Sequence, residues 1–178
     1  MNGIDWFSVH KEVPMTPIAG RPAIPADYGV ERGKTDQLLP WSWAEKRLAA
    51  AHNYWVATTR PDGRPHVMPV WGIWMDGAFY FGTGRSSRKG RNVATNPQVA
   101  VHLESGDEVV ILEGRLLPMD LADAGLVARF ASAYAAKYGI TPQVDSAGDI
   151  YYTLSPQVAL GWRERDFTSS ATRWKFEA

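Results

Sequence analysis

A series of short β-forming segments separated by tight-turn signals restricts the fold of this chain most strongly. The segments are rich in β-branched and aromatic residues. They span residues 54–59, 66–74, 78–81, 98–103, 109–117, 150–154 and 158–162, with a further candidate at 173–176. Pro61-Asp62-Gly63 marks a turn, and Asp76-Gly77 is a two-residue hairpin signal. Short strands joined by tight turns predict a mainly β protein built on an antiparallel barrel.

Pro69 lies inside the second segment and limits where that strand can sit in the sheet. Proline lacks the N–H that a central strand donates, so we expect this strand at an edge, or bulged near Pro69. Free backbone groups there could bond the polar edge of a flat ring; the alternative is a simple bulge at a barrel corner. Trp71 and Trp74 fall on opposite faces, and we expect one in the core and the other beside a cleft.

Few helices are expected. Ser42, as N-cap, and Glu45 form a capping-box pattern for a helix that ends near Ala51. A longer helix is expected from Asp120, as N-cap, to a stop at Gly139.

The N-terminal segment differs from the rest of the chain. Residues 1–36 contain recurrent prolines with little periodicity, so we interpret them as an extended arm that could be disordered or wrap a partner subunit. Residues 37–178 are expected to form a single domain.

Positive charge gathers where a short helix is expected to begin. The cations are Arg85, Arg88, Lys89 and Arg91, and either Ser86 or Ser87 is placed to cap the helix. A helix N-terminus already carries partial positive charge and free N–H groups, so cations there are unfavourable unless an anion lies among them. A phosphate is the simplest such anion, and a solvated basic turn is the alternative.

Composition excludes several classes of function. Lys plus Arg and Asp plus Glu both number 19, so the net charge is zero and nucleic-acid binding is not expected. Without cysteine, and with four scattered histidines, the chain is not expected to bind a metal. No membrane span or signal peptide is expected, and the cytoplasm is the default location. The familiar dinucleotide, P-loop and hydrolase motifs are absent, so no catalytic residue can be named.

Five motifs in chain order resemble the split β-barrel flavoproteins of the pyridoxamine 5′-phosphate oxidase-like family, especially its flavin/deazaflavin-dependent oxidoreductase branch. They are Gly63–Trp74, Asp76–Thr83, Ser87–Lys89, Asn96–Val101 and Leu112–Gly114. The resemblance covers residues 40–165 approximately. It implies an FMN-binding split barrel of six to seven antiparallel strands with a few flanking helices, assembled as a homodimer.

The resemblance also implies which residues hold the cofactor. The strand Val67–Trp71 would line the ring, largely through its backbone, and Thr83 would contact the ribityl chain or phosphate. The run Ser87–Lys89 would hold the phosphate, which agrees with the charge argument. Glu108 and Val109 would reach the cofactor across a two-fold dimer interface. The complete predicted set is His66, Val67, Met68, Pro69, Val70, Trp71, Thr83, Ser87, Arg88, Lys89, Glu108 and Val109.

Three functions are open at this point. The first is an oxidoreductase that uses FMN or coenzyme F-420 to move a hydride to or from a small planar organic substrate; the phosphate motif does not separate the two cofactors. The second is a non-catalytic protein of the same fold that binds or stores a flavin, deazaflavin or haem. Pyridoxamine 5′-phosphate oxidation ranks third, because only Arg163 and Arg165 could stand for the late basic residues of that enzyme.

Overall fold

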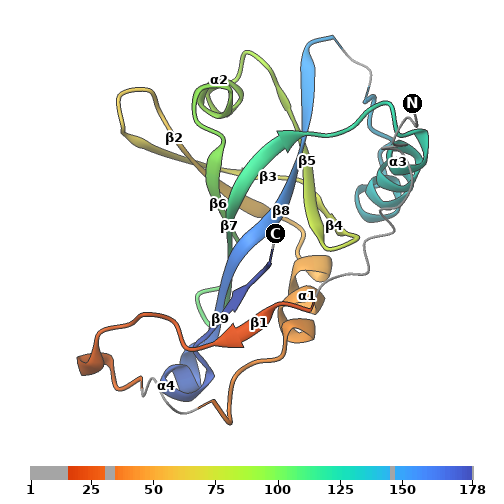
Figure 1. The fold of residues 1–178 in the computed structure, drawn as a ribbon. Coiled ribbons are helices and arrows are strands. Elements are labelled where there is room, and N and C mark those ends of the chain that lie inside the picture. The colour runs from red at the N-terminus through yellow and green to blue at the C-terminus, as the bar shows by residue number, and fades with distance from the viewer. Residues whose placement is uncertain (1–15, 31–34, 145–146, 178) are drawn as a thin grey trace, which may run out of the picture.

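The computed structural model describes residues 16–30, 35–144 and 147–177, and this part of the chain is mainly antiparallel β (Figure 1). Its strands are β1 (Ile18–Gly20), β2 (Tyr54–Thr59), β3 (Pro65–Val70), β4 (Ile73–Met75), β5 (Ala78–Gly84), β6 (Gln98–His102), β7 (Glu108–Pro118), β8 (Asp149–Arg163) and β9 (Thr172–Lys175). Its helices are α1 (Trp41–Ala50), α2 (Arg88–Thr95), α3 (Ala124–Tyr138) and α4 (Phe167–Ser170), with 3-10 turns η1 (Ala26–Tyr28) and η2 (Glu164–Asp166). The mainly β prediction with a few helices is confirmed.

The long strand β8 organises the sheet. The main path runs β1-β9-β8-β7-β6-β2-β3, and β5 joins it by pairing with β8. The first part of β8 pairs with β5 and its last part with β9, while β7 follows almost its whole length. The register shifts between Glu113 and Gly114 of β7, because Gln157 is an extra, unpaired residue in β8. Such a bulge bends the strand that carries it, here β8.

The barrel is split between β3 and β4. Strand β3 is hydrogen-bonded to β2 and ends the sheet path, whereas β4 pairs with β5. The chain crosses from one to the other at Trp71 and Gly72. The predicted strand 66–74 is therefore two strands, and β3 is an edge strand as Pro69 indicated.

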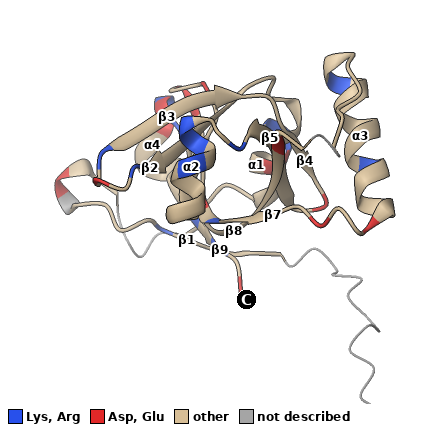
Figure 2. Cartoon of the chain, turned by 90° about the horizontal axis from the view of Figure 1, so that it is seen from above, with Lys and Arg blue, Asp and Glu red and all other residues tan. Residues whose placement is uncertain are grey.

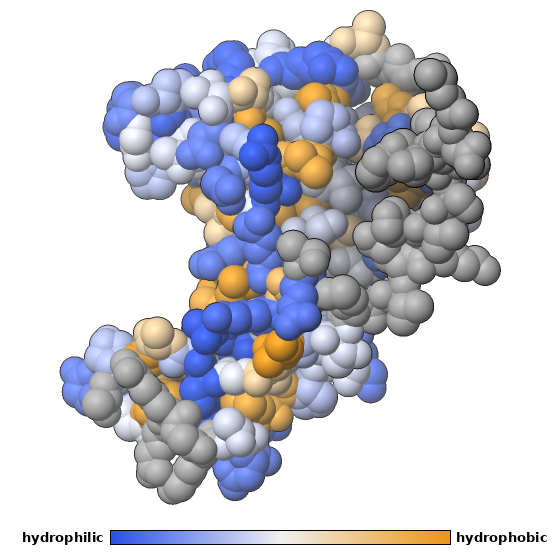
Figure 3. Space-filling view, viewed as in Figure 1, coloured by the Kyte–Doolittle hydropathy of each residue, from blue (hydrophilic) through white to orange (hydrophobic). Residues whose placement is uncertain are grey.

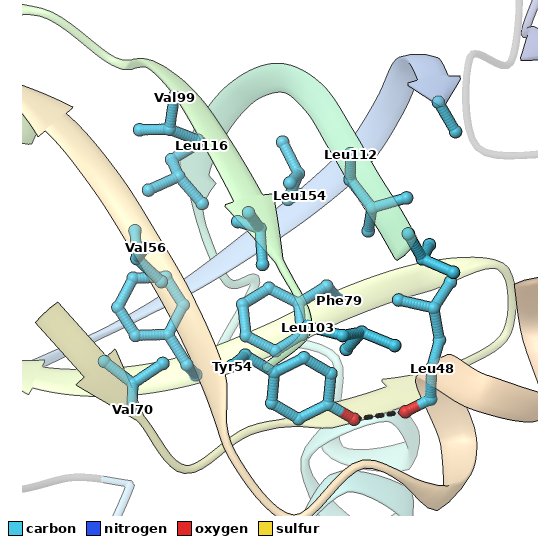
Figure 4. Close-up of a cluster of buried hydrophobic side chains, with 14 of the residues drawn as sticks. Leu48, Tyr54, Val56, Val70, Phe79, Val99, Leu103, Leu112, Leu116 and Leu154 are labelled. Atoms are coloured by element: carbon cyan, nitrogen blue, oxygen red, sulfur yellow. Dashed lines mark hydrogen bonds between the residues drawn. The ribbon is translucent and has the colours of Figure 1, made fainter. Parts of the chain in front are cut away.

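The core lies inside the barrel and is closed at one end by α1. Buried side chains from seven strands meet there. Tyr54 donates a hydrogen bond to the Leu48 carbonyl of α1 (Figure 4). Trp74 packs against this core, whereas Trp71 is 42% exposed, as expected for opposite faces. A second, smaller cluster lies under α3 and centres on Phe130.

Two predicted helix caps are wrong. Helix α1 begins after Pro40, with no side-chain cap, because Trp41 and Ser42 already lie in the helix. Helix α3 is capped by Asp123, whose Oδ1 accepts from the Leu126 N–H at 2.9 Å. Asp120 instead closes a turn by accepting from the Ala122 N–H. The predicted stop is confirmed, since Gly139 ends α3 at φ 71°.

The two predicted closing strands are one strand. Residues 150–154 and 158–162 both belong to β8, and the pairing with β7 continues across Ser155 and Pro156. Pro156 fits within the strand because its neighbour Gln157 is bulged, opposite Glu113 and Gly114, and breaks the regular ladder there. Strand β9 confirms the further candidate at 173–176. With β1 and the separate β4, the described residues form nine strands instead of six or seven.

Part of the predicted N-terminal arm has ordered contacts. Strand β1 pairs with β9, and Arg21 donates to the carbonyls of Ser169 and Ala171. Residues 1–15 and 31–34 of the arm, with 145–146 and 178, lie outside the described residues. None of the described helices is long and apolar enough to cross a membrane.

Candidate functional site

The N-terminus of α2 follows directly from the end of β5. Ser87 is its N-cap, and Ser87 Oγ accepts from the Gly90 N–H at 3.0 Å. Thr83 Oγ1 lies 3.0 Å from Ser87 Oγ, so the two hydroxyls are adjacent. A Cβ on Gly90 would lie 2.7 Å from the Gly84 carbonyl oxygen, so glycine lets α2 start this close to β5. The expected helix start is confirmed, with Ser87 and not Ser86 as the cap.

Two cations at this helix start have no acidic partner among the described residues. Arg88 is exposed and Lys89 is half-buried, and neither forms an ion pair in that part of the chain. Burial lowers the pKa of Lys89, because desolvation disfavours its ammonium. Figure 2 shows blue residues and no red ones on α2. Cations, hydroxyls and the first N–H groups of a helix are the donors that phosphate oxygens accept from.

A chain of hydrogen bonds ties α2 to the β2–β3 hairpin. Asn92 is buried in α2, and its Nδ2 donates to Thr58 Oγ1 at 2.9 Å. Thr58 Oγ1 in turn donates to the His66 carbonyl at 3.2 Å. Burial, followed by repulsion from Arg60, Arg88 and Lys89, lowers the pKa of His66. The basic turn and the start of β3 are therefore neighbours.

The backbone of β3 presents few donors on its free edge. The Arg60 N–H donates to the Arg64 carbonyl at 2.9 Å, and these residues are opposite each other in the β2–β3 register. Hydrogen-bonded pairs alternate with non-bonded pairs along an antiparallel ladder. Pro65, Val67 and Pro69 therefore direct their backbone groups away from β2. Because proline has no N–H, Val67 supplies the one amide donor of β3 on this edge, flanked by carbonyls.

The predicted residues of β3 differ in accessibility. The side chains of Val67, Met68 and Trp71 are 46%, 43% and 42% exposed. Pro69 is also exposed and His66 is half-buried. Val70 is buried in the core and lies opposite Tyr54 at a hydrogen-bonded position of the β2–β3 ladder, so neither its side chain nor its backbone groups face the free edge.

Glu108 and Val109 lie elsewhere in the chain. Arg47 holds the Glu108 carboxylate through two hydrogen bonds of 3.0 and 2.5 Å, and its guanidinium stacks on Trp43 at 3.8 Å. This hydrogen bonding, followed by the nearby positive charge, lowers the pKa of Glu108. Arg163, a candidate late basic residue, pairs with Asp166 at 2.5 Å. Arg165 is exposed.

Within a single chain, Glu108 and Val109 lie far from the basic turn. Gly84, just before the turn, pairs with Asp149 at the first end of β8, while Glu108 pairs with Arg163 at the other end. Strand β8 has 15 residues. At about 3.3 Å per residue, its two ends are separated by about 45 Å of extended chain.

A groove crosses the outer face of the sheet. It has a volume of about 450 Å³ and is lined by residues of β2, β6, β7 and β8 and by Pro65 of β3; Ala57, Gln98, Glu113 and Gln157 are among them. No predicted site residue lines it. Because side chains alternate along β7, Val109 and Glu113 point to the same outer face.

Several residues near the predicted site were not found from the sequence. Asn92 and Thr58 have no motif that marks them, and Arg60 lies in an ordinary turn. The Arg60 Nε is buried without a hydrogen-bond partner among the described residues. The contact of Arg47 with Trp43 has a sequence signal, because Trp43 lies four residues earlier on the same helix face. Among the described residues, no three histidines, aspartates or glutamates converge as metal ligands.

By its fold, with the basic turn after β5, this chain is an antiparallel split-barrel protein. A profile of the pyridoxamine 5′-phosphate oxidase family matches residues 44–154, and the chain belongs to this family. A segment of 73 residues is 42% identical to a pyridoxine/pyridoxamine 5′-phosphate oxidase from Sphingopyxis alaskensis. That segment is 39% of this chain and 33% of the relative, so the chain matches about a third of that protein's length.

Solved structures share the fold at low sequence identity. A conserved hypothetical protein, Rv2991 from Mycobacterium tuberculosis, gives a TM-score of 0.62 at 20% identity, over 76% of this chain and 91% of that one. A structure described as an F420 reductase gives 0.51 at 23% identity, over 65% and 94%. The heme storage protein HutZ from Vibrio cholerae gives 0.54 at 16% identity, over 64% and 87%. These similarities establish the fold alone.

Proposed function

We propose that this protein is an oxidoreductase that binds FMN or the deazaflavin coenzyme F-420. The observation that carries the proposal is the Asn92–Thr58 hydrogen bond, which holds the basic start of α2 beside the free edge of β3. A phosphate-bearing planar ring needs a donor-rich anion site next to a strip of backbone donors and acceptors. The family match and the F420 reductase among the similar structures support this proposal.

The chain's own residues would bind and orient the cofactor. Arg88, Lys89 and the Ser87 hydroxyl would hold the phosphate, with the Thr83 hydroxyl beside them. The Val67 N–H and the neighbouring carbonyls of β3 would bond the polar edge of the ring. When bound, the cofactor supplies the hydride chemistry toward a small planar organic substrate, and the protein supplies position and a dry surface.

We propose further that a second copy of the chain completes the cleft. Glu108 and Val109 are separated from the basic turn by the length of β8, so they could act on the cofactor only from a partner subunit. Val109, Ile111 and Glu113 point outward from β7, and the first two are only half-exposed. This face also carries the groove, which a second copy would cover.

An alternative is a protein that binds or stores haem without turnover. His66 is the residue that favours it, because a neutral imidazole can ligate iron and the lowered pKa of His66 favours the neutral form. A heme storage protein is also among the similar folds. Pyridoxamine 5′-phosphate oxidation is less well supported, because Arg163 is held by Asp166.

A side-by-side titration tests the proposal. The purified protein is titrated with FMN, coenzyme F-420 and haemin, using cofactor fluorescence or absorbance. Arg88→Ala combined with Lys89→Ala should weaken binding of FMN or F-420 by about 100-fold, since charge-assisted hydrogen bonds are lost. Lys46→Ala with Arg129→Ala removes two exposed cations elsewhere and should leave binding unchanged. Tight haemin binding that His66→Ala abolishes would favour storage instead.

Sedimentation equilibrium tests the dimer. The native protein should behave as a dimer, and Glu113→Arg on the outer face should shift it toward the monomer. A monomer at all concentrations that nevertheless binds the cofactor would contradict the shared cleft.

A further inference from the structure

The C-terminal turn of α3 meets the chain at the split of the barrel. Phe130, Tyr134 and Tyr138 follow one another at four-residue spacing on the face of α3 that covers the second hydrophobic cluster. Figure 1 shows α3 beside β4 and away from α2. The helix therefore reaches the β3–β4 junction with its last turn.

Gly72 has its backbone held by side chains of that turn. Its N–H donates to Tyr138 Oη at 2.9 Å, and its carbonyl accepts from Lys137 Nζ at 3.0 Å. The Tyr138 hydroxyl has one proton, which it donates to either the Gly72 or the His52 carbonyl, at 2.9 and 2.8 Å. These bonds replace the ladder that is interrupted between β3 and β4.

Trp71, the residue before Gly72, is stacked on the same tyrosine. The rings of Trp71 and Tyr138 are nearly parallel, 4.7 Å apart at 6°, and His52 meets both edge-on. Trp71 ends the strand proposed to line the cofactor ring and is 42% exposed. One side of its indole is therefore fixed, while part of the side chain remains accessible.

Lys137 anchors the turn to the barrel without an acidic partner among the described residues. Its Nζ donates to Tyr54 Oη at 2.9 Å and lies over the Tyr54 ring at 4.7 Å. Tyr54 is fully buried and is bonded to α1. Partial burial of an ammonium that bonds only neutral groups costs free energy. The contacts of Lys137 with Tyr54 and Gly72 offset that cost and hold its side chain at this junction.

We infer that Lys137 and Tyr138 are positioning residues that clamp Gly72 and thereby fix Trp71 at the end of the cofactor-lining edge. The part of this inference that names a cofactor beside Trp71 rests on the proposed function. The clamp on Gly72 does not. A displaced junction would move the last part of that edge, while the phosphate site at α2 would remain in place.

Tyr138→Phe tests the clamp, because it keeps the ring and removes the hydroxyl. Its matched control is Tyr134→Phe, one turn earlier, where the hydroxyl makes no hydrogen bond within the described residues. Deuterium exchange of the Gly72 amide in the free protein should accelerate by about tenfold in Tyr138→Phe and not in the control. If Tyr138→Phe does not fold, Lys137→Met is measured instead. It removes the bond to the Gly72 carbonyl, and the loosened junction should then also speed exchange of the Gly72 amide.

The bound state supplies a second readout. With FMN or F-420 bound, Tyr138→Phe should change the visible circular dichroism of the cofactor ring. Tyr134→Phe should give the wild-type spectrum. The melting temperature of each variant controls for a general loss of stability. Unchanged Gly72 exchange together with an unchanged ring signal would overturn the clamp. If the wild type binds neither cofactor, the proposed function is wrong. The exchange of the Gly72 amide, measured in the free protein, still tests whether Tyr138 clamps Gly72.

Discussion

Asn92 of α2 donates a 2.9 Å hydrogen bond to Thr58 of β2, and both side chains are buried. This bond joins α2, whose Arg88 and Lys89 form no ion pair within the described residues, to the edge hairpin of the barrel. The proposed phosphate site and the proposed ring site therefore depend on one buried polar contact.

Asn92→Ala should lower the free energy of unfolding by about 1–2 kcal/mol, because a buried hydrogen bond is lost and Thr58 keeps only its bonds to His66. Urea denaturation measures the change. Asn96→Ala, at the C-terminal end of the same helix, removes an exposed bond to the Gln98 N–H and should cost less. Equal losses in the two variants would contradict the special role of Asn92.

Ser87→Ala should destabilise the protein by about 1 kcal/mol, as expected for loss of an N-cap. It should also weaken binding of a phosphate-bearing cofactor, because Ser87 Oγ lies at the centre of the donor cluster. The matched control is Ser86→Ala, an exposed neighbour whose side chain makes no bond within the described residues. A larger loss in Ser86→Ala would mean that the cap is misassigned.

Gly72→Ala should be severely destabilising. The added Cβ would lie 2.4 Å from Cε2 of the Phe79 ring and 2.7 Å from the Tyr80 carbonyl oxygen, so the β3–β4 junction would have to shift. We expect a loss of about 2–3 kcal/mol or more, measured by chemical denaturation. Gly106→Ala, where the added Cβ meets no atom within 4 Å, is the control and should be nearly neutral. A small effect at Gly72 would show that the junction is pliable.

Lys137 should leave a signature in the pH dependence of stability. Burial lowers its pKa from 10.5 to about 8. Between these values the unfolded chain binds a proton that the folded chain does not, so this group makes the free energy of unfolding rise with pH. Below about pH 8 its unfavourable contribution is constant.

The comparison is between wild type and Lys137→Met at pH 7 and pH 9.5. Tyr54 and Tyr138, which face Lys137, have raised pKa values and are present in both proteins. The wild type should gain stability relative to the variant at the higher pH. A difference that is the same at both pH values would contradict the assignment.

Local patterns predicted the elements of this fold well. Propensity predicted the segment Tyr54–Thr59, and the missing proline N–H predicted an edge or bulged strand at Pro69. A short hydroxyl side chain predicted a cap at Ser86 or Ser87, and the structure selects Ser87. The cap at Asp120 was wrong because Asp123 has the same chemistry three residues later, and its Oδ1 accepts from the Leu126 N–H.

Contacts between distant segments could not be predicted in this way. Neither Asn92 nor Thr58 belongs to a motif, and their separation of 34 positions gives no local signal. Gly72 gave no sign of its bonds to Tyr138, 66 positions later. The continuity of β8 was also hidden, because Pro156 resembles a strand end until the bulge at the next residue, Gln157, is known.

The central claim is that Arg88 and Lys89 bind the phosphate of a ring cofactor whose ring lies along β3. The most direct measurement is a binding cycle: FMN against riboflavin, and F-420 against its phosphate-free deazaflavin, on wild type and on the Arg88→Ala, Lys89→Ala double variant. The account predicts that wild type prefers the phosphorylated form by about 100-fold and that the variant reduces this preference to about threefold. An undiminished preference in the variant, or none in the wild type, would contradict it.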